Sequence, residues 1–199
     1  MDFQLSPQQE QVRETIVRFV AQDMAPLVSE AEESEVFPRE LFRKWGELGL
    51  LGVRYPEADG GSGFDKVSDC IVREEMSRVC QAFASSWSAH THLALWPIWR
   101  AGTETQKARF FKPGLAGEKI GGFGLSEPDG GSDVRSMKTR ARKVEGGWRL
   151  TGSKLYITNA PHADFLTVAA RTKAEPVTDA ISLFLVELPN PGFSIGKLN

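Results

Sequence analysis

The chain has 199 residues and a mass of 22.0 kDa, which is enough for one large domain or two small ones with a full core. Its 24 basic and 26 acidic side chains leave a formal net charge of −2. That balance argues against a general nucleic-acid or membrane-surface binder. The 12 Phe and 5 Trp exclude a disordered chain.

The sequence also favours a compartment. It contains no run of about 18 apolar residues, the minimum for a membrane span. The first eleven residues lack the basic and apolar regions of a signal peptide, and Asp2 and Glu10 disfavour a mitochondrial transit sequence. On one helix, Cys70 and Cys80 would lie roughly 15 Å apart, too far for a disulfide. We expect a reduced, cytoplasmic protein.

The first 115 residues have the apolar spacing of helices. Ser6, Pro7 and Gln9 predict a capping box, and apolar residues at spacings of three and four follow. Pro26 should kink or end that helix. Further helices are predicted from Pro38 to Gly49, from Asp65 to Arg100 with a possible break, and from Thr103 to Pro113.

From Ile120 the pattern changes to short runs typical of strands, separated by Gly, Pro and Asn. Because helices precede strands and do not alternate with them, the sequence predicts an α+β protein. We expect an all-α helical domain at residues 1–117 and a small antiparallel β-domain at residues 118–199. The predicted strands are Ile120–Leu125, Lys138–Val144, Trp148–Leu150, Leu155–Thr158, Phe165–Ala170, Ile181–Glu187 and Phe193–Ile195.

Charge is unevenly distributed along the chain. Residues 1–65 have a balance of −7, whereas residues 135–154 have a balance of +6. Lys138, Arg140 and Arg142 alternate, so on a strand they would share one face. Two interpretations stay open: a solvated outer face of the sheet, or a surface that attracts a phosphate-bearing ligand.

One glycine-rich segment stands apart, residues 121–133 (GGFGLSEPDGGSD). Adjacent glycines let the backbone approach a ligand, and successive N–H groups in such a turn can bind an anion. On these grounds alone an ordinary turn is the simpler interpretation. The segment is not a phosphate-binding loop of the Gly-Lys-Ser/Thr type, nor a dinucleotide fingerprint that opens a helix.

The segment and its neighbours resemble the acyl-CoA dehydrogenase family. Residues 124–136 are similar to the first signature of that family, and the resemblance extends over essentially the whole chain. The other similar segments are residues 55–63 (YPEADGGSG), 97–107 (PIWRAGTETQK), 139–141 (TRA), 147–154 (GWRLTGSK) and 156–159 (YITN).

The resemblance implies that FAD lies along the β-domain and that acyl-CoA is the substrate. Phe123, Leu125 and Ser126 would contact the isoalloxazine ring. Gly131 and Ser132 would meet the FAD diphosphate, and Ser132 would also line the acyl-CoA entrance. Tyr156, often Trp in the family, would form a second flavin-contacting segment with Ile157 and Thr158, whose hydroxyl would lie near the reactive ring nitrogen.

The resemblance also implies that these 199 residues lack the catalytic glutamate of the family. Relatives are nearly twice as long, and their C-terminal helical domain supplies the catalytic glutamate and most oligomer contacts. No residue here matches that glutamate, so we assign no catalytic base and expect a truncated chain or one that needs a partner. Glu127 is expected to support its loop and not to act as the base.

The implied activity is α,β-desaturation of acyl-CoA with hydride transfer to FAD and electron transfer to an electron-transfer flavoprotein. The alternatives are a non-catalytic or heteromeric flavin- or CoA-binding subunit, an acyl-CoA oxidase and a flavin monooxygenase. Homo- or hetero-oligomers are expected, without nucleic acid. No metal site is expected, because His90 and His92 point to different sides of a helix. Trp87 and Trp96 are either core aromatics or residues that shorten an acyl pocket.

Overall fold

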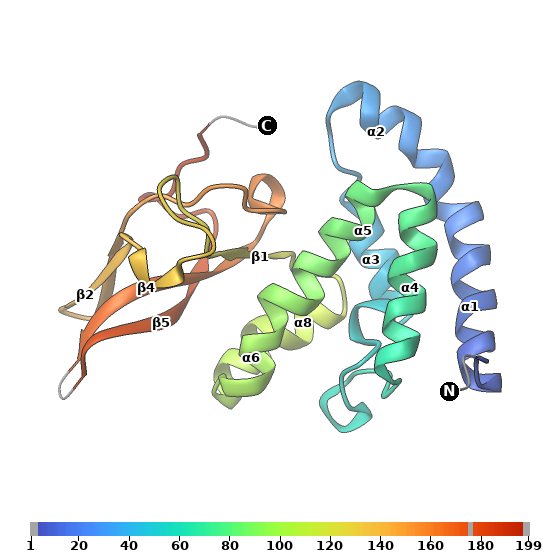
Figure 1. Cartoon of the computed structure of the whole chain (residues 1–199), viewed down its shortest axis with the longest axis horizontal. Coiled ribbons are helices and arrows are strands. Elements are labelled where there is room, and N and C mark those ends of the chain that lie inside the picture. Colours follow the sequence, from blue (N-terminus) through green and yellow to red (C-terminus); the bar gives the residue numbers. More distant parts are fainter. Residues whose placement is uncertain (1–3, 175–176, 197–199) are drawn as a thin grey trace. The chain divides into compact units, whose positions relative to one another are not determined.

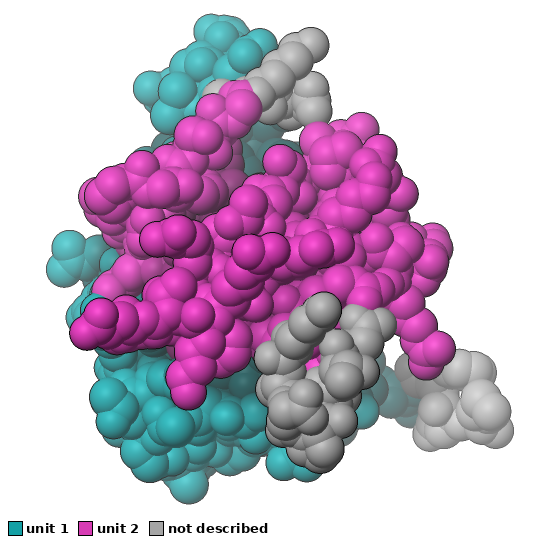
Figure 2. Space-filling view, turned by 90° about the vertical axis from the view of Figure 1, so that its left-hand side faces the viewer, with its two compact units in different colours: residues 1–119 teal, residues 120–199 magenta. Residues whose placement is uncertain are grey.

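The structure is a computed structural model that describes residues 4–174 and 177–196. It divides into two compact units, residues 1–119 and residues 120–199, which are coloured teal and magenta in Figure 2. The division falls after residue 119. The sequence predicts a domain boundary two residues earlier, after residue 117. Each unit has its own buried residues, so each is described by itself.

The first unit consists of helices joined by short turns (Figure 1). Helix α1 packs along α4, and α4 packs along α5. None of the described helices is both long and apolar enough to cross a membrane. The helices are α1 (Pro7–Phe19), α2 (Val28–Ser34), α3 (Glu40–Glu47), α4 (Lys66–Val79), α5 (Gln81–Ser88), α6 (Leu95–Ala101), α7 (Glu104–Gln106) and α8 (Lys112–Leu115).

The predicted helix starts are confirmed. The Ser6 hydroxyl accepts the Gln9 N–H, and the Gln9 side chain accepts the Ser6 N–H at 2.9 Å. Thr103 and Gln106 form the same capping box at the start of α7. At α4, the Asp65 carboxylate accepts the Ser68 N–H at 2.8 Å. These bonds satisfy N–H groups that have no partner inside the helix.

The helical path changes where the sequence predicts a break. Helix α1 ends at Phe19, and a π-helical turn (Val20–Met24) and a 3-10 turn (Ala25–Leu27) lead to α2. Pro26 lies in the second turn and has no N–H to continue the helical bonds. The expected interruption near Pro26 is therefore confirmed.

Aromatic side chains fill the interior of the first unit. Trp45 and Trp87 are fully buried, and the Trp87 indole N–H donates to the carbonyl oxygen of Leu50 at 2.9 Å. The Tyr55 hydroxyl donates to the carbonyl oxygen of Thr91 at 2.5 Å. A buried indole whose N–H is bonded is explained as a core residue. Trp87 therefore needs no role in binding a substrate.

The second unit is one five-stranded sheet around a long central strand. Strands β1 and β2 both pair with β4 in parallel, whereas β3 pairs with β2 and β5 pairs with β4 antiparallel. The prediction of an antiparallel sheet is wrong in this respect, because the long connections after β1 and β3 permit parallel pairing. The strands are β1 (Gly121–Gly124), β2 (Arg140–Val144), β3 (Gly147–Thr151), β4 (Phe165–Ala174) and β5 (Val177–Glu187).

Two predicted strands do not form. In the run Leu155–Thr158, Tyr156 has a φ of 56°, in the left-handed region, which ends any extended backbone. In the run Phe193–Ile195, the Phe193 N–H donates to the carbonyl oxygen of Asn190 at 2.9 Å and closes a turn instead. Alternating apolar residues suggest strands in both places, and local turn bonds override that pattern.

Candidate functional site

The two segments that the sequence predicts to contact a flavin lie side by side in the second unit. At one end, the Leu155 N–H donates to the carbonyl oxygen of Ser126 at 2.9 Å. At the other end, the Asn159 side-chain amide donates to the carbonyl oxygen of Gly121 at 3.2 Å. Residues 155–159 therefore run along β1 and the residues that follow it. Segments separated by about thirty to forty positions in the sequence thus lie side by side.

Gly122 makes this close approach possible. A Cβ atom at Gly122 would lie 2.8 Å from the Leu166 side chain and 3.0 Å from the carbonyl oxygen of Thr158. Any larger residue would push residues 157–158 away from β1. The glycine pair that the sequence singles out thus serves packing at this position.

The segment 155–159 presents two of its side chains, Tyr156 and Thr158, to solvent. Tyr156 is 77% exposed, although its backbone is held in the left-handed region at a φ of 56°. Thr158 is also exposed, and Ile157 is half-buried. On the first segment, Phe123, Leu125 and Ser126 are half-buried. An aromatic ring and hydroxyls beside apolar side chains form a surface that suits a flat aromatic ligand.

The turn after β1 is closed by backbone bonds. The N–H of Glu127 donates to the carbonyl oxygen of Gly130 at 2.9 Å, and the N–H of Gly130 donates back at 3.1 Å. Gly131 and Ser132 follow this turn directly and are exposed. A Cβ atom at Gly131 would meet no atom within 4 Å. The backbone there is open to a ligand, as a diphosphate contact requires.

Glu127 anchors the turn. Its carboxylate accepts the Lys138 N–H at 2.6 Å and the Thr139 N–H at 3.0 Å. The Lys154 ammonium donates to the same carboxylate at 2.8 Å and to the carbonyl oxygen of Leu125 at 3.1 Å. One side chain thus ties together the turn, the start of β2 and the segment before Tyr156. The prediction that Glu127 supports its loop is consistent with these contacts.

The charge state of Glu127 follows from this environment. Burial alone would raise the pKa of its carboxyl, but the hydrogen bonds from Lys154, from Thr139 and from the Lys138 backbone outweigh it and lower the pKa to about 2. A carboxylate with so low a pKa is a weak proton acceptor. Glu127 is therefore unsuited to act as a general base.

Sequence reasoning missed the partner of Glu127. Lys154 falls in the basic stretch 135–154 and in the similar segment 147–154, and neither pattern indicates a partner for its side chain. Its side chain is only 12% exposed, and that of Glu127 only 6%. Two acidic residues, Glu127 and Asp129, stand between the glycine runs at residues 121–124 and 130–131, and the sequence alone does not tell which of them is buried. A buried carboxylate needs a cation and N–H donors nearby.

The two histidines do not act together. His90 is buried, and its Nε2 lies 3.0 Å from the carbonyl oxygen of Gly114. His92 lies between Ser88 and Asp69, with its ring nitrogens 3.0 Å from an oxygen of each. Within residues 4–174 and 177–196, no group of His, Cys, Asp and Glu side chains could hold a metal ion. Cys70 and Cys80 carry free thiols.

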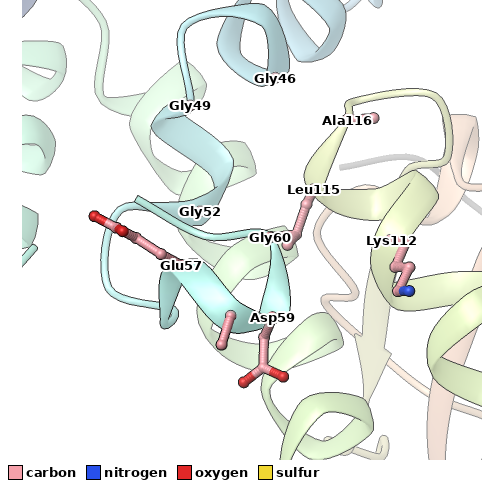
Figure 3. A pocket seen from close by; sticks show the side chains of 10 residues that line it. Gly46, Gly49, Gly52, Glu57, Asp59, Gly60, Lys112, Leu115 and Ala116 are labelled. Carbon is pink, nitrogen blue, oxygen red and sulfur yellow. The ribbon is translucent and has the colours of Figure 1, made fainter. Parts of the chain in front are cut away.

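A cavity of about 520 Å³ lies in the first unit (Figure 3). Glycines 46, 49, 52 and 60 line much of it, and Glu57, Asp59 and Lys112 add charge. The Asp59 carboxylate accepts the Trp99 indole N–H at 2.8 Å, so it has a structural partner. None of the predicted flavin-contacting residues lines this cavity. The candidate site is formed by residues 121–132 and 155–159, a partly exposed region in which Gly131, Ser132, Tyr156 and Thr158 reach solvent.

The fold and this surface define an α+β protein with a helical unit followed by a sheet that presents an aromatic and hydroxyl-bearing surface. The family model described as "Acyl-CoA dehydrogenase, N-terminal domain" matches residues 6–118, and the model "Acyl-CoA dehydrogenase, middle domain" matches residues 122–199. The chain belongs to the acyl-CoA dehydrogenase family.

The known proteins that are similar to the chain are named as dehydrogenases of different acyl-CoA substrates. Benzylmalonyl-CoA dehydrogenase of Aromatoleum aromaticum is 38% identical over 99% of this chain and 52% of its own length. Mitochondrial isovaleryl-CoA dehydrogenase of Pongo abelii is 40% identical over 97% and 47%. A glutaryl-CoA dehydrogenase of Mycobacterium smegmatis, solved in complex with FADH2, has a TM-score of 0.90 and 35% identity over 98% and 49%. The chain spans about half the length of the curated relatives it matches.

Proposed function

We propose that this chain is the helical and flavin-contacting part of an FAD-dependent acyl-CoA dehydrogenase. The observation that carries the proposal is that hydrogen bonds hold residues 155–159 against residues 121–126, which places the exposed Tyr156 and Thr158 beside the half-buried Phe123, Leu125 and Ser126. Family membership and the similarity to an enzyme solved with FADH2 support it. The proposed reaction forms a double bond between the α and β carbons of an acyl-CoA thioester.

The residues of this surface fit FAD. Phe123, Leu125 and Ser126 would contact one side of the isoalloxazine ring, with Tyr156 and Ile157 beside them. When bound, FAD supplies a ring that accepts a hydride from the substrate. The exposed Thr158 hydroxyl would donate a hydrogen bond to the ring nitrogen that the hydride reaches, which stabilises the reduced form.

The turn after β1 would hold the phosphate end of the cofactor. The backbone at Gly131 is open, and the exposed Ser132 hydroxyl can donate to a phosphate oxygen. We place Ser132 at the entrance for acyl-CoA as well. Glu127, held by Lys154, fixes the turn so that these donors keep their positions.

The reaction also needs a group that removes the substrate α-proton. Glu127 is excluded by its low pKa and its hydrogen bonds. We assign no base among the described residues and propose that a carboxylate from further residues or from a partner chain accepts the proton. We further propose electron transfer to an electron-transfer flavoprotein, an oligomeric enzyme and a cytoplasmic location.

The test is the visible spectrum of the purified natural protein, with any residues or partner chains that complete it. Anaerobic butyryl-, isovaleryl- and octanoyl-CoA are added in turn. Bleaching of bound flavin by one of them supports the dehydrogenase. Bound flavin that none of them bleaches favours a non-catalytic subunit, and the absence of bound FAD overturns the assigned surface. Rapid reoxidation of the bleached flavin by oxygen indicates an oxidase or monooxygenase.

A further inference from the structure

Three arginines share the outer face of the β2–β3 hairpin. Arg140 and Arg142 alternate along β2, so they point to the same side. In the register of the hairpin, Arg142 lies directly opposite Arg149 of β3. All three are exposed. We call this set, Arg140, Arg142 and Arg149, the arginine face.

The arginine face is not neutralised within the described part of the chain. None of its members forms an ion pair there, in contrast to the nearby pairs Lys138–Asp129 and Lys154–Glu127. Like charges directly opposite each other destabilise an antiparallel pair. The opposed charges of Arg142 and Arg149 therefore repel each other within the hairpin. An anionic ligand that binds across Arg142 and Arg149 would relieve this repulsion.

Glu127, which closes the candidate diphosphate turn, also bonds to residues at both ends of the β2–β3 hairpin. Glu127 accepts the N–H groups of Lys138 and Thr139, and β2 begins at the next residue, Arg140. At the other end of the hairpin, β3 ends at Thr151, and Lys154 bonds to Glu127. Arg140, the first residue of the arginine face, thus directly follows Thr139, whose N–H donates to the Glu127 carboxylate. Glu127 therefore connects the strand that carries Arg140 to the turn that Gly131 and Ser132 follow.

We propose that the arginine face binds the phosphate groups of the coenzyme A part of the substrate. The inference rests on the proposed function and extends it. Coenzyme A carries a diphosphate and a 3′-phosphate, whereas the acyl group and the pantetheine arm carry no phosphate. A guanidinium forms two parallel hydrogen bonds to a phosphate, and two opposed arginines can hold one phosphate between them. The face also raises the local concentration of an anionic substrate.

The experiment compares two substrates that differ only in the phosphates. The same acyl group is supplied as the CoA thioester and as the pantetheine thioester, to the natural protein and to the Arg142→Gln/Arg149→Gln variant. A matched control, Arg18→Gln/Arg100→Gln, removes two exposed charges from the helical unit, where neither arginine has an ion pair within residues 4–119. Thermal unfolding checks that each variant folds.

For the variant of the arginine face, kcat/KM with acyl-CoA at low salt should fall about tenfold, and its salt dependence should weaken. In the same variant, kcat/KM with acyl-pantetheine and the affinity for FAD should stay unchanged. In the Arg18→Gln/Arg100→Gln control, kcat/KM should stay unchanged with both substrates. Equal losses with both substrates, or no loss with acyl-CoA, would overturn the inference. A matching loss of FAD affinity would assign the arginines to the cofactor and also overturn it.

A binding measurement separates this inference from the proposed function. Calorimetry with free coenzyme A and with pantetheine needs no turnover. A natural protein that turns over neither substrate yet binds coenzyme A through Arg142 and Arg149 would refute the dehydrogenase and sustain the inference. Coenzyme A binding that is equal in the natural protein and the variant would refute the inference, whatever the activity.

Discussion

The Lys154 ammonium lies 2.8 Å from a carboxylate oxygen of Glu127, and both side chains are largely buried. The pair is surrounded by backbone groups: two N–H groups bond to the carboxylate and a carbonyl accepts from the ammonium. Charges removed from water are tolerated when such bonds satisfy them. The pair therefore holds the turn after β1 against the segment that leads to Tyr156.

Removing the charge of Glu127 should loosen this region. In the Glu127→Gln variant, Lys154 keeps a buried charge without its counterion, which we expect to cost about 3 kcal/mol. Native-state hydrogen exchange of the Lys138 and Thr139 amides should become roughly 100-fold faster.

A matched control is available on the same turn. Asp129 pairs with Lys138 at 2.6 Å, but both side chains are exposed, at 69% and 72%. Asp129→Asn should change stability by less than about 1 kcal/mol. Equal effects of the two substitutions would show that burial of the Glu127–Lys154 pair has no special importance.

The same carboxylate makes the second unit sensitive to acid. The folded pKa of Glu127 is about 2, against an ordinary value of 4.5. Because the folded pKa is the lower one, its stabilisation is complete above about pH 4.5 and is lost as the pH falls toward 2. The loss should amount to roughly 3 kcal/mol. Exchange of the Lys138 and Thr139 amides, corrected for intrinsic rates, should report it.

The Glu127→Gln variant has no carboxyl to titrate at this position. Between pH 5 and pH 2.5 its stability should therefore fall less steeply than that of the natural chain. Parallel pH profiles for the two proteins would contradict the assignment of the low pKa to Glu127.

Much of the helical unit could be predicted because its signals are local. The capping boxes at Ser6 and Thr103 and the interruption at Pro26 involve residues at most four apart. Parallel pairing of β1 with β4 joins Gly121 to Phe165, and nothing in either strand alone indicates that partner. Such pairing depends on where the connections lead.

The candidate site shows the same division. The motif identified Tyr156 as a flavin-contacting residue, but its alternating neighbours suggested a strand. The left-handed backbone at Tyr156 depends on tertiary bonds at both ends of the segment, to Ser126 and to Gly121. The Glu127–Lys154 pair likewise joins residues that only the fold brings together. Tertiary contacts of this kind override local propensity.

Tyr156 should respond in opposite directions in stability and in binding. Its left-handed backbone suits glycine better by about 1 kcal/mol, and the ring is 77% exposed. Tyr156→Gly should therefore leave stability unchanged or raise it slightly. Loss of the ring should weaken FAD binding several-fold in the purified natural protein, measured by titration of flavin fluorescence.

Tyr156→Phe keeps the ring and serves as the control, so its FAD affinity should remain close to that of the natural protein. A Tyr156→Gly variant that binds FAD as tightly as Tyr156→Phe would remove Tyr156 from the proposed flavin surface. A large loss of stability in Tyr156→Gly would indicate instead that the ring has a structural role.

Two glycines of the second unit should differ sharply when replaced by alanine. At Gly152 a Cβ atom would lie 2.7 Å from the Thr139 Cα and 2.8 Å from its Cβ, so the start of β2 would have to move. Gly152→Ala should destabilise the unit by about 2 kcal/mol. At Gly131 a Cβ atom meets nothing within 4 Å, so Gly131→Ala should leave stability unchanged or raise it by about 0.5 kcal/mol.

A side chain at residue 131 should be unfavourable only when a ligand is bound there. If its backbone meets the FAD diphosphate, the added methyl group of Gly131→Ala should weaken FAD binding about tenfold while thermal unfolding without FAD is unaffected. Gly152→Ala should have the opposite effect: it should lower the unfolding temperature, whereas the protein that remains folded should bind FAD with nearly its natural affinity. A Gly131→Ala variant that is stable and binds FAD normally would place the diphosphate elsewhere, because within residues 120–174 and 177–196 no atom lies within 4 Å of that Cβ position.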